Sequence, residues 1–478
     1  MNSDNIVAIA TGHSLTSAIG IIRISGSNLK SIVFNLTKQE YLQPRYAYYQ
    51  KIYNISEDFS SNNSQNQLID IALVIYFEGP KSFTGEDVLE IHAHGNHILL
   101  NNIVNSCLKL GCRMAKAGEF SQRAYLNGKL DLVQAESIAD LINAQSQVEI
   151  KGALASLQGN FSKRIYTLNQ HLVKLRVFVE ASLDFPEEDI EFIANEKVVA
   201  QMTIIEQQMI NLLSSVQQGV LLTNGAKIII IGQPNVGKSS LFNVLADEDL
   251  AIVTDIAGTT RDLLQQQILI NGVTFNLLDS AGIRDSDDII EQIGVNKAVT
   301  ALTHADICVL LIDISLYDSC TSDILNKIKD NLSSATPLII VFNKIDKIKD
   351  SALLQSTITS LTDLLNKKFD QHLHKVDYLA ISVKEKLGLE LLRQKILAAV
   401  GYNKLDHKEV FTARNRHLNA VKASKKHLGA AVLLAQNNQL ELLAEELRLA
   451  HDTLSSITGD FVADDLLGEI FSSFCIGK

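Results

Sequence analysis

The sequence predicts a multidomain α/β protein in which a domain with a parallel sheet is inserted between two parts of a helical domain. Three observations support this fold class. At 478 residues the chain is too long for one hydrophobic core. Up to about residue 128, short β-branched runs alternate with turns. Between about residues 224 and 400, buried-strand runs alternate with helical segments, and long helical stretches flank this region on both sides.

Residues 1–128 predict an N-terminal α+β domain. The expected strands are "IVAIA", "AIGIIRIS", "DIALVIYF" and "DVLEIHAHG", which are apolar runs rich in β-branched residues. A helix over residues 96–111, "NHILLNNIVNSCLKLG", closes this mixed unit. The polar stretch "SEDFSSNNSQNQ" between two of the strands predicts a surface loop.

Residues 129–222 and 402–478 predict the two parts of one helical domain. In the first part, Leu132, Ala135 and Ile138 begin an apolar stripe at helical spacing, and Pro186 interrupts the helices. In the second part, "HLNAVKASKKHLGAAVLLAQ" and "ELLAEELRLAHDTLSSI" again have the pattern of helices. Residues 223–401 are the predicted insert, which a surface loop accepts at little cost when the two ends of the insert lie close together.

Composition limits the location and the partners of the protein. A formal net charge of −11 argues against a protein that coats nucleic acid, so a nucleic-acid partner would need a local basic patch or a basic companion subunit. Five cysteines without a CxxC pair predict free thiols in a reducing compartment. No apolar run approaches the roughly 18 residues of a membrane-spanning helix, and the N-terminus lacks a secretory or transit pattern. We therefore expect a cytoplasmic protein without a membrane span.

A phosphate-binding loop is predicted at Gly232–Ser239, "GQPNVGKS", which fits GxxxxGK[ST]. The loop follows the strand "IIII" and precedes the helical "SLFNVLA", so a helix N-terminus would face the phosphates. The two glycines allow the backbone N–H groups to point inward. Lys238 would meet the β- and γ-phosphates, and the hydroxyl of Ser239 would hold Mg²⁺.

Four further segments predict a Ras-like GTPase domain. "DSAG" at 279–282 supplies an Asp linked to Mg²⁺ and a Gly that senses the γ-phosphate, and "TDIAGTTRD" at 254–262 supplies Thr260 as a second Mg²⁺ ligand. "NKID" at 343–346 ends in an Asp that can accept hydrogen bonds from guanine N1 and N2, and "ISVK" at 381–384 would contact guanine O6. The predicted GTP-binding residues are Asn235, Val236, Gly237, Lys238, Ser239, Ser240, Thr254, Asp255, Ile256, Ala257, Gly258, Thr259, Thr260, Asp279, Ser280, Ala281, Gly282, Asn343, Lys344, Ile345, Asp346, Ser382, Val383 and Lys384.

Two residues refine the predicted hydrolysis mechanism. Ile283 follows "DSAG", where Ras-like proteins have the glutamine that positions the attacking water, so another group must position the water or hydrolysis is slow. The amide oxygen of Asn235, together with carbonyls from a closed switch, could cage a monovalent cation. Such a cation would replace an arginine finger electrostatically.

Several stretches together make the sequence similar to the MnmE (TrmE) family of tRNA-modification GTPases over nearly the whole chain. These stretches are "GIIRISG", "SFTGEDVLE", "GEFSQRAYLNGKLDL", "GQPNVGKSSL", "TDIAGTTRD", "LAEELRLA" and the terminal "FSSFCIGK". Two small departures are "DSAG" in place of DTAG, and Val383 where the guanine loop commonly has Ala. At both positions the backbone makes most of the contact with the nucleotide.

The resemblance implies an N-terminal domain that binds 5-formyltetrahydrofolate or a related one-carbon folate, and a helical domain interrupted by a GTPase that uses GTP, Mg²⁺ and K⁺. It also implies a homodimer formed through the N-terminal domains, and a heterotetramer with the flavoprotein MnmG (GidA). Together these proteins would add an aminomethyl or carboxymethylaminomethyl group at C5 of the wobble uridine of certain tRNAs. GTP hydrolysis would drive the conformational cycle.

Residue roles follow from the resemblance by motif. Glu291 would orient the attacking water, which answers the question raised by Ile283, and the tail would place Cys475 near the modification site as a catalytic group. The implied potassium ligands are Asn235, Thr254, Ile256 and Thr259, and the implied folate contacts are Arg23, Glu90, Lys129 and Lys478.

Alternative interpretations remain for several features. Arg23 could form a strand-edge salt bridge, Cys475 could be a packed thiol, and the histidines of "EIHAHGNH" could be strand and loop residues near a pocket and not metal ligands. "FCIGK" fits a prenylation box poorly. For the whole protein, the rival function is a GTP-driven timer of ribosome assembly, a class that usually carries a basic RNA-binding module.

Overall fold

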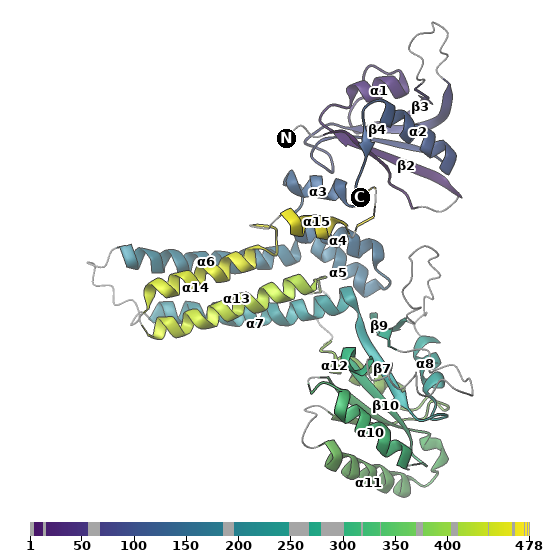
Figure 1. The fold of residues 1–478 in the computed structure, drawn as a ribbon, viewed down its shortest axis with the longest axis vertical. Coiled ribbons are helices and arrows are strands. Elements are labelled where there is room, and N and C mark those ends of the chain that lie inside the picture. Colours follow the sequence, from purple (N-terminus) through teal and green to yellow (C-terminus); the bar gives the residue numbers. More distant parts are fainter. Residues whose placement is uncertain are drawn as a thin grey trace. The chain divides into compact units, whose positions relative to one another are not determined.

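The structure is a computed structural model in which the chain forms two compact units (Figure 1). Unit 1 comprises Met1–Ile142, Ser156–Ile205 and Ala423–Lys478, and unit 2 comprises Asn143–Ala155 and Glu206–Lys422. This division follows contacts, and it groups part of the predicted helical domain with the insert. The residues that the structure describes are 4–12, 16–55, 67–184, 196–247, 267–278, 301–316, 319–334, 336–369, 376–402, 410–437, 439–460, 464–472, 474, 475 and 477.

A six-stranded sheet forms the N-terminal part of unit 1. Its strands are antiparallel except for the pair β1–β6. Helix α2 lies within the predicted range 96–111, and the Oδ1 atom of Asn96 caps it by accepting from Ile98 N at 2.9 Å. The spatial order is β3 (Ala47–Tyr53), β4 (Leu68–Phe77), β5 (Asp87–Asn96), β2 (Thr16–Gly26), β1 (Ile6–Ile9) and β6 (Arg113–Met114), and the helices are α1 (Lys30–Thr37), α2 (His97–Lys109) and α3 (Glu119–Leu126).

Strand alternation divides this sheet into a core face and a second face. Ile22 and Ile24 of β2 and Ile91 of β5 are fully buried in one hydrophobic cluster. Because successive side chains of a strand point to opposite faces, Arg23 of β2 and Glu90 of β5 lie on the other face, and the register makes them direct neighbours. The predicted α+β domain is therefore confirmed, and its sheet places two predicted folate contacts side by side.

The rest of unit 1 is helical. Asn169 in α6 donates from Nδ2 to Ser455 Oγ in α14 at 2.9 Å, and both residues are buried. Ser424 in α13 donates to the carbonyl of Ala450 in α14 at 2.7 Å. The helices are α4 (Leu132–Asn143), α6 (Asn160–Asp184), α14 (Leu440–Ser455) and α15 (Asp464–Ser472), with the first part of α7 (Glu196–Asn224) and most of α13 (Asn415–Gln436).

Unit 2 contains a second six-stranded sheet. All neighbouring strands are parallel except the hairpin β8–β9. This pattern confirms the predicted α/β insert with crossover helices. The spatial order is β12 (Val376–Ala380), β11 (Leu338–Asn343), β10 (Ile307–Asp313), β7 (Ala226–Gly232), β9 (Val273–Leu277) and β8 (Gln267–Ile270); the helices are α8 (Lys238–Asp247), α10 (Ser319–Asn331), α11 (Ser351–Phe369) and α12 (Leu389–Ala399), with the short η2 (Ile345–Lys347). Helix α5 (Gln147–Leu157) joins this unit through residues 147–155.

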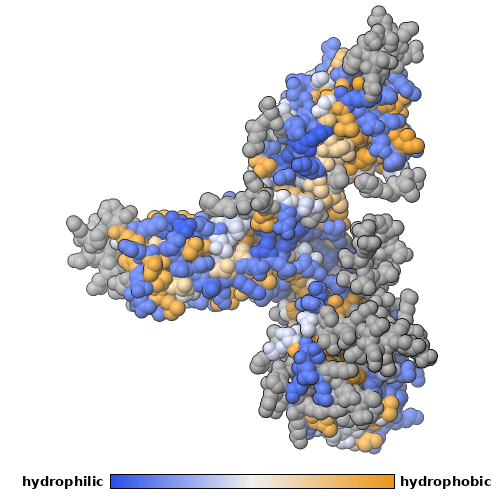
Figure 2. Space-filling view, in the orientation of Figure 1, coloured by the Kyte–Doolittle hydropathy of each residue, from blue (hydrophilic) through white to orange (hydrophobic). Residues whose placement is uncertain are grey.

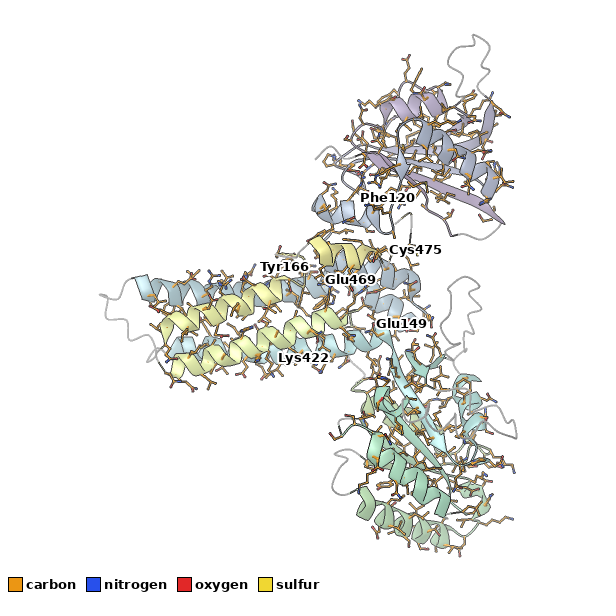
Figure 3. The ribbon with its side chains drawn as sticks, in the orientation of Figure 1. Phe120, Glu149, Tyr166, Lys422, Glu469 and Cys475 are labelled. Atoms are coloured by element: carbon orange, nitrogen blue, oxygen red, sulfur yellow. The ribbon has the colours of Figure 1, made fainter. Side chains whose placement is uncertain are left out.

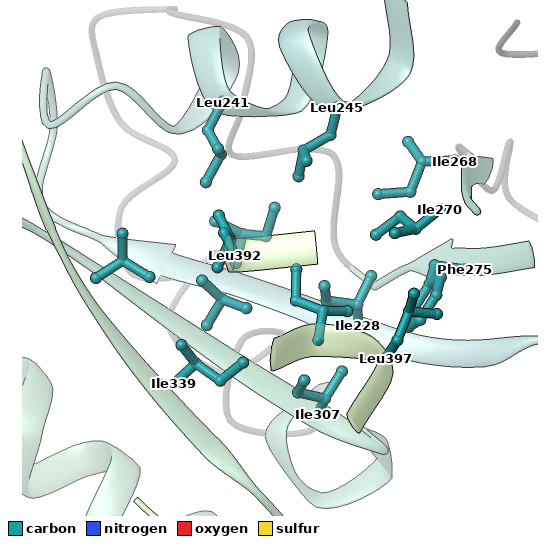
Figure 4. Close-up of a cluster of buried hydrophobic side chains, with 14 of the residues drawn as sticks. Ile228, Leu241, Leu245, Ile268, Ile270, Phe275, Ile307, Ile339, Leu392 and Leu397 are labelled. Carbon is teal, nitrogen blue, oxygen red and sulfur yellow. The ribbon is translucent and has the colours of Figure 1, made fainter. Parts of the chain in front are cut away.

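The core of unit 2 fixes the strand ends that carry the nucleotide site (Figure 4). Ile228 of β7 and Phe275 of β9 are fully buried, as are Leu241 of α8 and Leu392 of α12. The runs "IIII" and "LIIVF" are apolar on both faces because helices cover both sides of a parallel sheet. Across the described ranges, no helix is long and apolar enough to cross a membrane.

Candidate nucleotide-binding site

The predicted phosphate loop joins the end of β7 to the start of α8. Asn235 and Gly237 have φ values of 60° and 102°, which lie in the left-handed region. A Cβ atom on Gly237 would lie 2.7 Å from Asn343 Nδ2, so this position needs glycine both for its backbone and for the close contact. Since α8 begins at Lys238, the N–H groups of its first turn are directed toward the loop, where an anion binds favourably.

Lys238 folds back over the loop that it follows. Its Nζ atom donates to the carbonyls of Gly232 at 2.9 Å and Gln233 at 2.8 Å. Both acceptors are neutral, whereas phosphate oxygens would form charge-assisted hydrogen bonds that are about twice as strong. The ammonium group and the helix N-terminus therefore suit the phosphates of a nucleotide.

Asn343 connects the phosphate loop to the predicted base-binding segments. Its Nδ2 donates to the carbonyl of Val236 at 2.8 Å, and its Oδ1 accepts from Val383 N at 3.1 Å. Ser382 donates to Asp346 Oδ1 at 2.6 Å, and this hydrogen bond is the main reason that the pKa of Asp346 lies below its usual value. Asp346 is thus an ionised acceptor at the carboxyl ends of β11 and β12, which is the chemistry that guanine N1 and N2 require.

Asp313 is a member of this site that the sequence analysis missed. Its carboxylate is 2% exposed and lies 2.9 Å from Lys344 Nζ and 3.0 Å from Lys347 Nζ. Although burial opposes ionisation, hydrogen bonds from Ser315 and the two lysines hold the pKa of Asp313 well below its usual value. Lys344 also donates to the carbonyl of Asn235 at 2.6 Å. Asp313 therefore orients the lysine that joins the base-binding segment to the phosphate loop.

A second constellation lies in unit 1, where the C-terminal tail meets the N-terminal sheet. Arg23 forms an ion pair with Glu90 at 2.8 Å and donates from Nη1 to the carbonyl of Gly477 at 3.4 Å. Gly118 N donates to the carbonyl of Cys475 at 3.4 Å. Gly477 therefore lies beside Arg23, although the two residues are far apart in the sequence. Arg23 does form a salt bridge, but it joins the central strands β2 and β5 and does not lie at a strand edge; both side chains remain partly exposed.

Aromatic rings surround the guanidinium group of Arg23. The rings of Phe83 and Phe120 have their centroids 5.7 Å and 5.8 Å from Arg23 Cζ. Lys129 is exposed and lies close to Gly85, since a Cβ atom built on Gly85 would be 3.4 Å from Lys129 Cγ. An exposed aromatic side chain (Phe83), cationic groups and a carboxylate are the groups that a folate would need. Phe83 stands in "SFTGEDVLE", but no spacing in the sequence marked it as a neighbour of Arg23.

The four cysteines whose side chains the structure describes divide into buried and exposed thiols. Cys107, Cys112 and Cys308 are buried, and burial raises the pKa of Cys112 to about 11 and of Cys308 to about 12. These two thiols are therefore unreactive packing groups at neutral pH. Cys475 is exposed at the C-terminal end, close to α3 in Figure 3. The buried-thiol interpretation of the tail is thus wrong for Cys475.

The histidines of β5 pair with carboxylates. His92 Nε2 lies 3.3 Å from Glu90 Oε2, and His94 Nδ1 lies 2.8 Å from Asp70 Oδ1. Within the described part of the chain, no group of three or more His, Cys, Asp or Glu side chains could hold a metal ion. The histidines of this strand thus have ordinary polar partners.

Comparison with known proteins decides the family. The profile of the MnmE helical domain matches residues 132–475, and that of the GTP-binding protein TrmE N-terminus matches residues 5–129. The tRNA modification GTPase MnmE of Francisella philomiragia is 44% identical over 99% of this chain and 99% of its own length. The chain belongs to the MnmE family. A second relative of the same name, from Legionella pneumophila, is 44% identical over the full length of both chains.

Membership of the MnmE family identifies the nucleotide site as that of a GTP hydrolase. Asn343 hydrogen-bonds to Val236 and Val383, so the phosphate loop and a base-binding segment lie next to each other, and the GTP contacts of these residues stay a prediction. The remaining predicted residues lie outside the described residues: Thr254, Asp255, Ile256, Ala257, Gly258, Thr259, Thr260, Asp279, Ser280, Ala281, Gly282, Ile283, Glu291 and Lys478.

Proposed function

We propose that this chain uses GTP hydrolysis to drive a folate-dependent modification of tRNA together with a flavoprotein of the MnmG type. The product would be an aminomethyl or carboxymethylaminomethyl group at C5 of the wobble uridine. The observation that carries this proposal is the tail, because the carbonyl of Gly477 accepts from Arg23 and Cys475 is exposed on the same short segment. A GTPase that served only as a timer would not need this second constellation.

The second constellation supports a bound one-carbon folate. Arg23 and Lys129 would pair with the carboxylates of the glutamate tail, and Glu90 would accept from the amino and N–H groups of the pterin. Lys478 would add a cation at the end of the tail. A one-carbon folate supplies the carbon of the new group when it is bound, and the residues of this chain hold and orient it. Cys475 would act close to the uridine that is modified.

For the GTPase reaction we propose a potassium ion next to the phosphate loop. Asn235 is exposed, and its left-handed backbone turns the loop at this point. Ser239 and Thr260 would bind Mg²⁺, and Glu291 would orient the attacking water. Thr254, Ile256 and Thr259 would complete the potassium cage with Asn235. Both cations supply positive charge next to the phosphates, where negative charge grows in the transition state.

We further propose a homodimer formed through the N-terminal sheet, and a heterotetramer with the flavoprotein. Tyr49, Leu73 and His92 are aligned across β3, β4 and β5 by the strand register. Tyr49 is 72% and Leu73 is 44% exposed, and Ile19 of β2 is 59% exposed. Figure 2 shows hydrophobic residues at the surface of the N-terminal part of unit 1. Exposed apolar and aromatic side chains on this sheet face, which also carries Arg23 and Glu90, support pairing with a second copy.

Deletion of the gene followed by mass spectrometry of digested tRNA tests the proposed function. We expect the modified wobble uridine to disappear in the deletion strain and to return when the chain is supplied on a plasmid. A deletion strain with normally modified wobble uridine would contradict the proposal. The rival function, a timer of ribosome assembly, predicts instead that the tagged chain purifies with ribosomal subunits and without a flavoprotein.

A further inference from the structure

The N-terminus of helix α5 is capped jointly by its own residues and by the β8–β9 hairpin. Ser146 Oγ accepts from Glu149 N at 3.2 Å, and Glu149 Oε2 accepts from Gln145 N at 2.6 Å; this resembles a capping box, except that the carboxylate reaches the N–H one residue before Ser146. The hairpin adds two hydrogen bonds to this cap. Ser146 Oγ donates to the carbonyl of Gly272 at 2.6 Å, and Thr274 Oγ1 donates to Glu149 Oε1 at 2.6 Å. Both oxygens of the Glu149 carboxylate are therefore in use.

This contact is buried and closely packed. Glu149 is 7% exposed and Thr274 is 8% exposed. A Cβ atom on Gly272, which has φ +82°, would lie 2.6 Å from Val148 Cγ2. In Figure 3, Glu149 lies at the end of α5 that faces β9. A buried carboxylate that accepts from two donors holds its partners in one geometry, because losing one bond leaves a charged oxygen without a partner.

The β8–β9 hairpin lies between the two predicted switch segments of the GTPase sequence. Strand β8 starts after the predicted Mg²⁺-binding switch at 254–262, and β9 ends just before Asp279 of the predicted second switch. Helix α5 also contacts the segment that leads from the GTPase sheet to α13. Thr412 N donates to the carbonyl of Gly152 at 3.3 Å. Within unit 2, α5 therefore connects the strand pair between the switches to the chain that continues into α13.

We propose that Glu149 is a positioning residue that couples the β8–β9 hairpin to helix α5, so that the nucleotide state of the GTPase reaches the helical part of the chain. This inference rests on the proposed GTP-driven cycle. When the switches rearrange, β9 moves and displaces Thr274. The hydrogen bond from Thr274 to the Glu149 carboxylate transmits this displacement to the first turn of α5. The capping box alone would cap the helix; the two bonds to the hairpin make the cap sensitive to the GTPase.

Hydrogen–deuterium exchange of α5 in the full-length chain, loaded with GDP or with a non-hydrolysable GTP analogue, tests this coupling. In the parent protein we expect the exchange rate of the α5 amides to differ between the two nucleotides by about tenfold or more. Thr274→Val removes the donor and should abolish that difference while the affinity for GDP stays within about twofold of the parent. Thr274→Ser keeps the hydroxyl and should restore the difference. Glu206→Gln, a change of an exposed carboxylate on α7, is the matched control.

Each outcome decides between coupling and simple capping. If Thr274→Val retains the full nucleotide-dependent difference, or if the parent shows none, the coupling proposal is overturned. Should Thr274→Val not fold, Glu149→Gln weakens the same contact and is measured in its place. Analysis of tRNA from cells carrying each variant separates this inference from the proposed function. Loss of modification with Thr274→Val but not Thr274→Ser supports coupling, whereas absence of modification even with the parent chain rejects the proposed function itself.

Discussion

At the residue scale, Asp346 is the proposed determinant of which base the nucleotide site accepts. Its ionised carboxylate can receive hydrogen bonds from guanine N1 and N2, and Ser382 holds it in place. We expect Asp346→Asn to lower the affinity for GDP by about tenfold to a thousandfold, because hydrogen bonds to a charged group contribute about 1.5–3 kcal/mol each. Titration with a fluorescent GDP analogue measures this change. Asp363→Asn, an exposed change on α11, should bind as the parent does, and equal binding by both variants would contradict the assignment.

Asp313 predicts a dependence of stability on pH. Its pKa is lowered in the folded protein, so its contribution is complete above the unfolded-state pKa of about 4 and is lost as the pH falls through the lower folded-state pKa. We expect Asp313→Asn to reduce the free energy of unfolding at pH 7 by about 1–3 kcal/mol and to remove part of the acid sensitivity. Urea denaturation at a series of pH values measures both effects.

The matched control for Asp313 is Asp377→Asn. Asp377 also pairs with a lysine, Lys395, at 2.8 Å, but its side chain is 39% exposed. A surface pair contributes only about 0–1 kcal/mol, so this variant should change stability little. If the two variants lose the same free energy of unfolding, the buried position of Asp313 does not make its ion pairs more stabilising than a surface pair.

At the scale of elements, Gly272 shows how closely the β8–β9 hairpin approaches helix α5. A side chain at Gly272 would collide with Val148 and would need an unfavourable φ of +82°. We expect Gly272→Ala to destabilise unit 2 by about 1–3 kcal/mol in thermal or urea unfolding. Gly429→Ala is the control, because nothing lies within 4 Å of its added Cβ on helix α13. That change should stabilise the chain by about 0.5–1 kcal/mol. A Gly272→Ala protein as stable as the parent would show that the hairpin tolerates displacement.

Sequence patterns predicted the helices and strands well where neighbouring residues in the chain determine them. The order of β7, phosphate loop and α8 follows from an apolar run, a glycine-rich turn and a helical run that adjoin in the sequence. The partners of Glu149 and Asp313 were missed because Thr274 and Lys344 are brought to them by the tertiary fold. The grouping of residues 143–155 with the GTPase unit was missed for the same reason, since helical periodicity does not reveal which sheet a helix contacts.

At the scale of the whole molecule, the proposed cation site predicts that GTP hydrolysis depends on the salt. We expect hydrolysis to be faster in K⁺ than in Na⁺ by about tenfold or more, because a correctly sized cation would stabilise charge in the transition state. Asn235→Ala should reduce the rate in K⁺ to the rate in Na⁺. Asn271→Ala changes another asparagine with positive φ and controls for backbone strain. Equal rates of the parent protein in the two salts, measured by phosphate release, would argue against the potassium site.

The central claim is that GTP hydrolysis by this chain drives modification of tRNA. The most direct test is to supply the deletion strain with the parent chain or with Lys238→Ala, and to quantify the modified wobble uridine by mass spectrometry. Lys238→Ala removes the ammonium group that the phosphate loop holds for the nucleotide. We expect full modification with the parent chain and almost none with Lys238→Ala at equal protein levels. Full modification with a Lys238→Ala protein that does not hydrolyse GTP would contradict it.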